Sequence, residues 1–359
     1  MDIYSVCKAL QFDGEVVKYE VLSGGNINTT YHVTCKNSNG EVDYLLQRIN
    51  KNVFKKPEGI MGNIVNVTDY IANKSNNSNL KTLQFSKDVN GKAYVVDDNG
   101  DFWRAREFLD CVCFNTTDNL SVIEQAGIAF GEFQYLLDGY DASTLFESIP
   151  NFHNTVKRFE NLEKAVSLDL AGRKSECASE IKFLIENKEK ASILINLLND
   201  GSLPLRVTHN DTKCNNVVFN KNTLKALAVI DLDTIMSGLT AYDFGDGARS
   251  ICCTSLEDEA DLSKVTFDLK RFEAFTKGYL SHLRATLTNN EIYSLIDGVF
   301  VMTIELASRF LEDYLNGDVY FKISYENQNL LRARCQIALC KDIIAKSDKI
   351  KQIILKYTK

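Results

Sequence analysis

The stretch "VTHNDTKCNNVVFN", residues 207–220, places ionisable and amide side chains directly before an apolar segment. The letters "VVF" at 217–219 are typical of a strand, and "LAVI" at 227–230 predicts a second strand that ends beside Asp231. Two short strands flanking a turn would bring three polar residues to one edge of a small hairpin: Asp211, Asn216 and Asp231. Carboxylate and amide oxygens gathered in this way predict a metal and phosphate site.

These three residues suit phosphoryl transfer from ATP. That reaction needs a carboxylate to orient the attacking hydroxyl and accept its proton, and oxygen ligands for the Mg²⁺ that bridges the phosphates. The protein-kinase pattern H-R-D-x-x-x-x-N, followed later by D-F-G, has the same separation of Asp and Asn. Here Asn210 replaces the arginine, and Asp231-Leu232-Asp233 replaces D-F-G. We therefore predict Asp211 as the catalytic base, with Asn216 and Asp231 as magnesium ligands.

A simpler interpretation of the same stretch is a polar turn whose Asp and Asn side chains cap backbone amides. The joint occurrence of all three residues in the expected strand or turn context favours the catalytic interpretation. We expect His209 to brace the loop. The roles of Lys213 and Asn215 stay open, since Lys213 could either meet the transferring phosphoryl group or be a solvated lysine.

A literal Asp-Phe-Gly also occurs at residues 243–245, within "GLTAYDFGDGARS". It lies 32 residues after Asp211, beyond the strand that already supplies Asp231. We interpret it as a structural turn and helix start beneath the site. The alternative is that Asp243 or Asp246 orders the metal loop or touches substrate.

The N-terminal third predicts an antiparallel sheet of about five strands. Three strands are expected at 15–22, 29–35 and 43–49, separated by turn-forming Gly and Asn residues, and residues 92–109 read as a further hairpin. After Pro57, apolar residues recur with helical spacing. The opening order is therefore three strands, a helix and a hairpin.

The remainder of the chain is expected to be mostly helical, beginning after a helix cap at Asn119. We place the boundary near residue 110, with a nucleotide-binding N-lobe at 1–110 and a catalytic, sugar-binding C-lobe at 111–359. The predicted fold class is α+β, a bilobal protein-kinase-like fold with an antiparallel N-lobe sheet plus a helix and a mostly helical C-lobe.

The predicted nucleotide contacts come from the first lobe. The segment "LSGGNINTTYHV" (22–33) contains Gly24, Gly25 and Asn26 between two strands, where backbone amides can approach the ATP phosphates. On the third strand Arg48 is the expected phosphate cation, although a surface arginine is the plainer interpretation. Glu58 is a candidate partner for that cation or a first-turn helix residue. The segment 106–111 should join the lobes and read the adenine.

Composition limits the partners. The 359 residues carry a net charge of -7 and a pI near 5.3, which disfavour nucleic acid or an anionic membrane as the main partner. No apolar run approaches the length needed to cross a bilayer, and the N-terminus does not resemble a signal peptide, so we expect a cytoplasmic protein. The ten scattered cysteines, without a C-x-x-C pair, predict reduced and mostly buried thiols.

Five stretches together resemble the bacterial N-acetylhexosamine 1-kinases within the aminoglycoside and choline phosphotransferase superfamily. They are "YLLQRINKNVFKKPEGIMGNIVNVT" (44–68), "NFHNTVKRF" (151–159), "THNDTKCNNVVF" (208–219), "VIDLDTIMSGLTAYDFGDGAR" (229–249) and "SRFLEDYLNGDVYFK" (308–322). The likeness spans about residues 20–325. It implies a protein-kinase-like bilobal fold and transfer of the γ-phosphoryl group of ATP, with Mg²⁺, to the anomeric hydroxyl of GlcNAc or GalNAc.

The resemblance also implies site residues. Asp211 matches the family's catalytic base, Asn216 and Asp231 its magnesium ligands, and Arg309 with Tyr320 the lining of the sugar pocket. A salt-bridge ladder with neighbouring acidic residues of the same helix is the structural alternative for Arg309, and a core position is the alternative for Tyr320. His32 and His153 are further polar-pocket candidates for which a structural role is favoured.

Two rival functions stay open. The first keeps ATP but changes the acceptor to another sugar, choline, homoserine or an aminoglycoside; an amine acceptor would favour a cage of acidic and aromatic groups. The second is a nucleotide-binding regulator without turnover, which the three intact site residues disfavour. The sequence does not define the oligomeric state, and a monomer is compatible with it.

Overall fold

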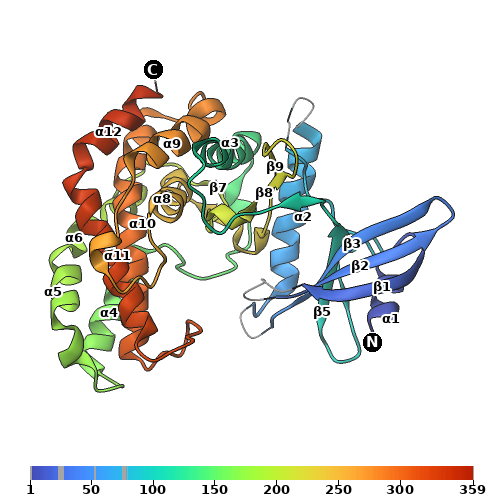
Figure 1. Cartoon of the computed structure of the whole chain (residues 1–359), viewed down its shortest axis with the longest axis horizontal. Coiled ribbons are helices and arrows are strands. Elements are labelled where there is room, and N and C mark those ends of the chain that lie inside the picture. The colour runs from blue at the N-terminus through green and yellow to red at the C-terminus, as the bar shows by residue number, and fades with distance from the viewer. Residues whose placement is uncertain (1, 23–27, 52–53, 75–77, 79, 359) are drawn as a thin grey trace.

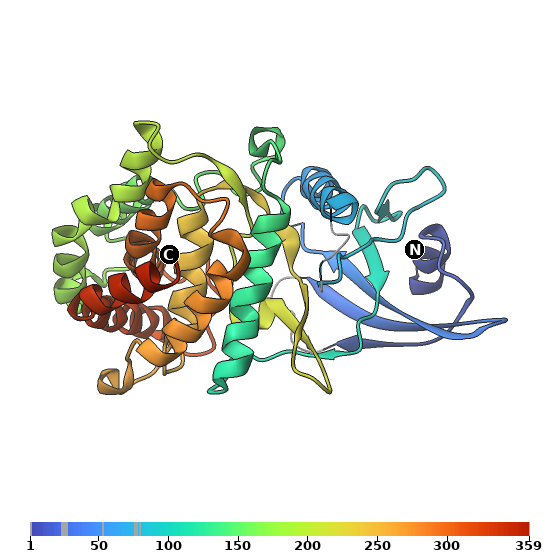
Figure 2. The same cartoon turned by 90° about the horizontal axis from the view of Figure 1, so that it is seen from above.

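The computed structural model describes residues 2–22, 28–51, 54–74, 78 and 80–358. Its N-terminal part is a five-stranded antiparallel sheet with the order β1-β2-β3-β5-β4. The strands are β1 (Glu15–Leu22), β2 (Thr29–Asn37), β3 (Gly40–Ile49), β4 (Val95–Val96) and β5 (Phe102–Glu107). Figures 1 and 2 show this sheet on one side of the molecule and a larger helical region on the other.

The two faces of the sheet pack against different helices. Helix α1 (Ile3–Ala9) covers the outer face, where Leu46 and Trp103 join a small apolar cluster with Val6 and Leu10 of the N-terminal segment. Helix α2 (Pro57–Lys74) contributes to the main core with Ile49 and Phe102 of the opposite face. Because side chains alternate along a strand, Gln47 and Arg48 of β3 must point to opposite faces.

The chain enters the helical region through residues 108–110 and the short strand β6 (Cys111–Val112). Two small sheets lie there, with the orders β6-β8-β9 and β10-β7. Their remaining strands are β7 (Arg206–Thr208), β8 (Val217–Asn220), β9 (Ala226–Val229) and β10 (Met236–Gly238). The antiparallel β8–β9 hairpin and the loop before it lie on the side of the helices that faces the N-terminal sheet (Figures 1 and 2).

The rest of the region is helical. The helices are α3 (Leu120–Leu136), α4 (Thr155–Leu168), α5 (Ala178–Glu186), α6 (Lys188–Ala191), α7 (Ile193–Asn199), α8 (Thr240–Cys252), α9 (Leu269–Leu283), α10 (Asn289–Leu315), α11 (Gln328–Ala345) and α12 (Ser347–Lys356). The main hydrophobic core continues from α2 through these helices.

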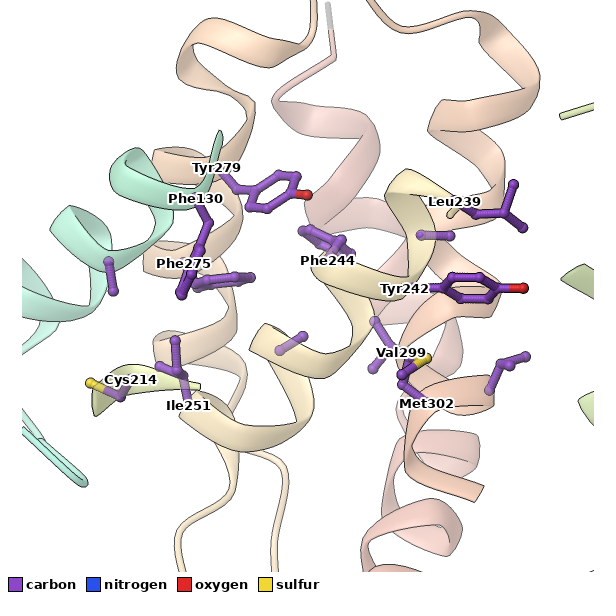
Figure 3. Packing of buried hydrophobic residues seen from close by; sticks show 14 of the residues in the cluster. Phe130, Cys214, Leu239, Tyr242, Phe244, Ile251, Phe275, Tyr279, Val299 and Met302 are labelled. Carbon is purple, nitrogen blue, oxygen red and sulfur yellow. The ribbon is translucent and has the colours of Figure 1, made fainter. Parts of the chain in front are cut away.

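Helix α8 lies at the centre of this core. Figure 3 shows its Phe244 between aromatic residues of α9, with Val299 and Met302 of α10 on another side. A Cβ atom on Gly245 would collide with the backbone carbonyl of Gly298, so α8 and α10 approach each other closely at a pair of glycines. This packing holds α8 rigidly against its neighbours.

The structure confirms the predicted fold class, the five-stranded sheet and the hairpin around β4 and β5, where Gly100 adopts a positive φ of 71°. Asn119 caps α3 by accepting a hydrogen bond from the Ser121 amide. All ten cysteines are free thiols, and seven are buried. Within the described ranges, no helix combines the length and apolar character that a bilayer crossing requires.

Candidate active site

The β8–β9 hairpin brings Asp211, Asn216 and Asp231 together. Val217 pairs with Val229, and the Ile230 amide donates to the Asn216 carbonyl at 2.9 Å, so Asn216 and Asp231 lie at the same end of the hairpin. The Asn216 side-chain nitrogen donates to the Asp211 carbonyl oxygen at 2.7 Å and to its carboxylate at 2.9 Å. The three residues predicted from the opening stretch therefore form one cluster.

The electrostatics of this cluster suit a cation. Burial, together with the neighbouring carboxylates of Asp233 and Asp211, raises the pKa of Asp231 to about 6 against the opposing effects of Lys213 and His209. A divalent cation would stabilise the charged form of these carboxylates. The amide nitrogen of Asn216 is used in the two bonds above, which leaves its oxygen as the atom that could coordinate metal.

The donor set fits magnesium better than a soft metal. No group of three or more His, Cys, Asp or Glu side chains among the described residues is arranged to hold a metal ion. The possible ligands of the cluster are oxygen atoms: the carboxylates of Asp211 and Asp231 and the amide oxygen of Asn216. Mg²⁺ is ordinarily bound by one or two carboxylates, while phosphate oxygens and water complete its shell.

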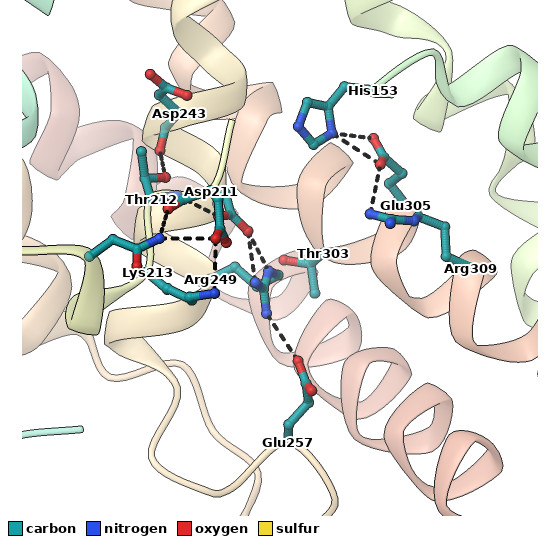
Figure 4. A network of polar contacts seen from close by, with 12 residues as sticks. His153, Asp211, Thr212, Lys213, Asp243, Arg249, Glu257, Thr303, Glu305 and Arg309 are labelled. Atoms are coloured by element: carbon teal, nitrogen blue, oxygen red, sulfur yellow. Dashed lines mark hydrogen bonds and ion pairs between the residues drawn. The ribbon is translucent and has the colours of Figure 1, made fainter. Parts of the chain in front are cut away.

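Residues 209–213, called the catalytic loop after the role predicted for Asp211, are held in place by α8. The Asp243 carboxylate accepts the backbone amides of His209 and Asn210, each at 2.8 Å, and the side chain of Gln134 at 2.6 Å. The Thr212 amide donates to Asp246 at 2.9 Å, and the Thr212 hydroxyl donates to the Asp243 carbonyl at 2.6 Å (Figure 4). Asp243 and Asp246 thus order the loop from the start of a helix beneath the site.

His209 is fully buried and braces the same loop. Its Nε2 lies 2.9 Å from the Ile230 carbonyl oxygen, and its Nδ1 accepts the Asp211 amide at 3.2 Å. Its own carbonyl oxygen accepts the Thr234 hydroxyl at 2.7 Å. The imidazole therefore ties the base-bearing turn to the segment on either side of Asp231, as the sequence predicted.

The structure shows the contacts of Lys213 and Asn215, whose roles could not be decided from the sequence. Lys213 Nζ lies 2.8 Å from the Asp211 carboxylate. Burial would lower the pKa of Lys213, but the carboxylates of Asp211, Asp231 and Asp246 together raise it above its ordinary value. Lys213 is consequently a charged member of the cluster. Asn215 instead donates to Asn115 at 3.1 Å and ties the loop to the segment after β6.

The placement of Arg48 contradicts the role predicted for it. Its guanidinium contacts Asp101 at 3.4 Å and lies 5.8 Å from the Trp103 ring centroid, on the outer face of the sheet. The strand was assigned the wrong alternation: Gln47, and not Arg48, points to the face where Arg104 meets Asp233 of the helical region, which we call the cleft side. Glu58 is an exposed residue in the first turn of α2, and the ion pair of Arg48 is with Asp101 instead.

A cation missed by the sequence reasoning lies on that cleft side. Arg104 of β5 is buried, forms an ion pair with Asp233 and donates to Gln47 Oε1 at 3.0 Å. Asn63 of α2 adds a second link between the two parts, since its side chain donates to the Ile235 carbonyl at 2.8 Å. The two arginines of the buried strand "FWRARE" were the available signal.

The other nucleotide predictions have mixed outcomes. Gly24, Gly25 and Asn26 lie outside the described residues. The segment 106–111 does connect the sheet to the helical region: the Phe108 amide donates to Asp43 at 3.0 Å, and β6 pairs with β8. The His32 ring stacks on the Phe108 ring, with 4.2 Å between their centroids. Arg106 begins the connecting segment, and burial lowers the pKa of its guanidinium to about 10, so it stays charged at neutral pH. This connection therefore has a positively charged group at its start.

A second polar group, the Arg309 cluster, consists of Arg309, Glu305, His153, Arg158 and Glu312. The Glu305 carboxylate is buried between His153 Nδ1, at 3.1 and 3.2 Å, and Arg309, at 3.8 Å (Figure 4). The Nε2 atom of His153 is buried without a hydrogen-bond partner among the described residues. Burial would raise the pKa of Asp246, but the adjacent Arg249 lowers it below its ordinary value, and His153 of the cluster adds a smaller effect in the same direction.

The structure agrees only in part with the structural alternatives, which were a salt-bridge ladder for Arg309 and a core position for Tyr320. Arg309 pairs with Glu305, but Asp313 accepts the backbone amides of residues 319–321 instead of completing a ladder. Tyr320 is 64% exposed, which excludes a core role, and its ring centroid lies 5.9 Å from the Arg309 guanidinium. The two predicted sugar-pocket residues therefore lie side by side at the surface end of the cluster.

Residues 18–275 match the family described as the APH phosphotransferase enzyme family. The chain belongs to this family. Among solved structures it is similar to an aminoglycoside phosphotransferase from Alicyclobacillus acidocaldarius subsp. acidocaldarius DSM 446, with 12% identity, coverage of 99% of this chain and 97% of that chain, and a TM-score of 0.65.

Two further structures share the family fold. A microcompartment-associated aminopropanol kinase has 15% identity over 98% of this chain and 99% of that chain, with a TM-score of 0.60. The ethanolamine kinase of Plasmodium vivax has 14% identity over 89% of this chain and 82% of that chain, with a TM-score of 0.55. At these identities the likeness shows a protein-kinase-like fold, and the acceptor must be argued from the residues of this chain.

Proposed function

We propose that this phosphotransferase transfers the γ-phosphoryl group of ATP to the anomeric hydroxyl of an N-acetylhexosamine, GlcNAc or GalNAc, and releases the sugar 1-phosphate. The observation that carries the reaction type is the cluster of Asp211, Asn216 and Asp231 at one end of the β8–β9 hairpin. In this proposal residues 1–110 bind the nucleotide, and residues 111–359 supply the catalytic groups and the sugar pocket.

Asp211 is the proposed catalytic base. It is 31% exposed at its side chain and can receive an acceptor hydroxyl from the cleft, while Asn216 and Lys213 fix its carboxylate. An anomeric hydroxyl is more acidic than an ordinary alcohol, so the carboxylate need only orient it and take its proton late in the transfer. Most of the rate enhancement then comes from positioning and charge stabilisation.

Asn216 and Asp231 are the proposed magnesium ligands. They would hold the cation, which when bound would supply positive charge to offset that of the phosphates. Lys213 adds a fixed positive charge beside Asp211, where charge develops during transfer. Asp243, Asp246 and His209 hold the backbone of the loop, so that these groups keep their spacing without reorganisation.

The choice of an uncharged acceptor is supported by the Arg309 cluster. Its carboxylates already have cationic neighbours: Glu305 contacts His153 and Arg309, and Arg158 and Arg309 oppose the rise that burial causes in the pKa of Glu312. The rings of Phe152, Tyr320 and Phe321 lie 5.0, 5.9 and 5.4 Å from the Arg309 guanidinium. An amine acceptor would meet these cations, whereas sugar hydroxyl and amide groups can accept their hydrogen bonds.

A panel of acceptors incubated with ATP and Mg²⁺ tests the proposal. ADP release should be stimulated by GlcNAc or GalNAc and much less by glucosamine, choline, ethanolamine or an aminoglycoside. Asp211→Asn is the matched control, because it should retain ATP binding and lose several orders of magnitude in turnover. Stimulation by an amine alone would support the alternative acceptor class, and a lack of turnover with every acceptor would support a nucleotide-binding regulator.

A further inference from the structure

A cross-strand row of polar residues lies on the cleft face of the N-terminal sheet. Thr30 of β2 is paired with Gln47 of β3, and Gln47 is paired with Arg104 of β5. Gln47 donates to the Thr30 hydroxyl at 3.2 Å and accepts from Arg104 Nε at 3.0 Å. The row therefore forms a hydrogen-bonded chain that ends in a guanidinium.

That guanidinium is buried and contacts the segment after the metal ligand. The Arg104 side chain is 4% exposed and the Asp233 side chain 3%, and the two form an ion pair. The other Asp233 oxygen accepts Asn28 Nδ2 at 2.7 Å, and Asn28 Oδ1 accepts the Asn50 amide at 3.0 Å. Asp233 is thus held by Asn28, which directly precedes β2, and by Arg104 of β5, although it follows Asp231 by only two positions.

Kinases ordinarily place the corresponding cation elsewhere. A lysine on the third strand is paired with a glutamate of the following helix, and the pair must be in place for activity. In this chain β3 presents the neutral Gln47 to the cleft, and the α2 residue next to Arg104 is Met61, whose sulfur lies 3.8 Å from Nη1. In this chain the buried cation is Arg104 on the neighbouring strand β5. Its carboxylate partner is Asp233, in the turn that follows Asp231.

We propose that Arg104 is a positioning residue of the nucleotide and metal site, acting through Asp233 on the turn that carries Asp231. The pair makes the geometry of the metal ligands depend on the docking of the N-terminal sheet. Removing one member leaves the other charge buried and unpaired, so the turn should lose its position even where the chain stays folded. The proposal rests on the phosphotransfer activity and not on the identity of the acceptor.

Steady-state kinetics of Arg104→Gln, Arg104→Lys and Asp233→Asn test the inference, with Arg48→Gln as the matched control on the outer face. We expect Arg104→Gln and Asp233→Asn to raise both the KM for ATP and the half-saturating Mg²⁺ concentration about tenfold or more. The KM for the acceptor should change less than twofold, and Arg48→Gln should match the wild type. Arg104→Lys should recover part of the loss because it keeps the charge.

Calorimetric titration with ADP and Mg²⁺, without any acceptor, separates this inference from the proposed function. Weaker nucleotide binding in Arg104→Gln and Asp233→Asn, with no further loss in the double variant, would support a coupled pair. Folded variants with wild-type nucleotide affinity and magnesium dependence would overturn it. An equal rise in the KM values for ATP and acceptor would also overturn it. If Arg104→Gln does not fold, the isosteric Asp233→Asn and the charge-retaining Arg104→Lys decide the question by the same criteria.

Discussion

Asp243→Asn is expected to weaken the support of the catalytic loop without touching the metal site. In the wild type one carboxylate oxygen accepts the Asn210 amide, and the other accepts the amide of His209 and the side chain of Gln134. An asparagine oriented to keep the Asn210 bond turns its NH₂ group toward the other two donors. Gln134 can turn its side-chain amide so that its oxygen accepts from this NH₂ group. The backbone N–H of His209 can only donate, so it loses its partner.

The magnitude follows from these contacts. Leaving the buried His209 amide unsatisfied costs about 1–3 kcal/mol, and replacing a charged acceptor of the Asn210 amide by a neutral one costs roughly a further 1 kcal/mol. Burial raises the pKa of Asp243, so neutralising it recovers part of the desolvation cost. The net fall in the free energy of unfolding should therefore be about 1–3 kcal/mol, equivalent to roughly 1–4 °C in Tm for a chain of this length.

The assay combines thermal unfolding with steady-state kinetics. We expect a lower Tm and a turnover reduced on the order of tenfold, because the loop samples non-productive positions, while the half-saturating magnesium concentration stays near that of the wild type. A wild-type Tm together with a sharply raised magnesium requirement would refute the reasoning. It would mean that the literal Asp-Phe-Gly at 243–245 supplies a metal ligand, as its letters suggest.

Four further outcomes are expected. Asp231→Ala should raise the magnesium requirement by on the order of a hundredfold, seen in metal titrations of activity, and an unchanged midpoint would exclude it as a ligand. Lys213→Met should lower kcat by about tenfold to a hundredfold with little change in the KM for ATP, because it removes a fixed charge beside the base; a wild-type kcat would make it a solvated lysine. Arg206→Gln leaves the buried Glu291 carboxylate without its cation and should lower the free energy of unfolding in urea by about 3 kcal/mol, whereas an unchanged midpoint would contradict the pairing. Glu305→Gln should raise the KM for the sugar several-fold and leave that for ATP unchanged; the reverse pattern would remove the Arg309 cluster from the acceptor site.

The cluster at the hairpin could be predicted from sequence because its geometry is local. Asp211 and Asn216 are separated by a single loop, and Asp231 follows the next short strand, so strand and turn chemistry alone bring them to one edge. The same local reasoning gave the cap at Asn119 and the antiparallel strands of the N-terminal sheet. Such features depend on residues that are close along the chain.

The buried cation on the inner face of the sheet could not be predicted in this way. Arg48 and Gln47 differ by one position, and the alternation of a strand gives opposite faces to neighbours, so a one-residue ambiguity in phase exchanged the cleft residue for a surface one. Arg104 becomes visible only through its contact with Asp233, which lies 129 positions away in the chain. Asp243 presents the same difficulty, since its letters match a metal-binding motif while its partners belong to the loop 33 and 34 residues earlier.

The central claim is tested most directly by ³¹P NMR of the product formed from ATP, Mg²⁺ and GlcNAc or GalNAc. The account predicts a sugar phosphate whose phosphorus couples to the anomeric proton, formed by the wild-type protein and not by Asp211→Asn. Phosphate on another hydroxyl of the sugar, or transfer to an amine-bearing acceptor while both N-acetylhexosamines stay unmodified, would contradict it.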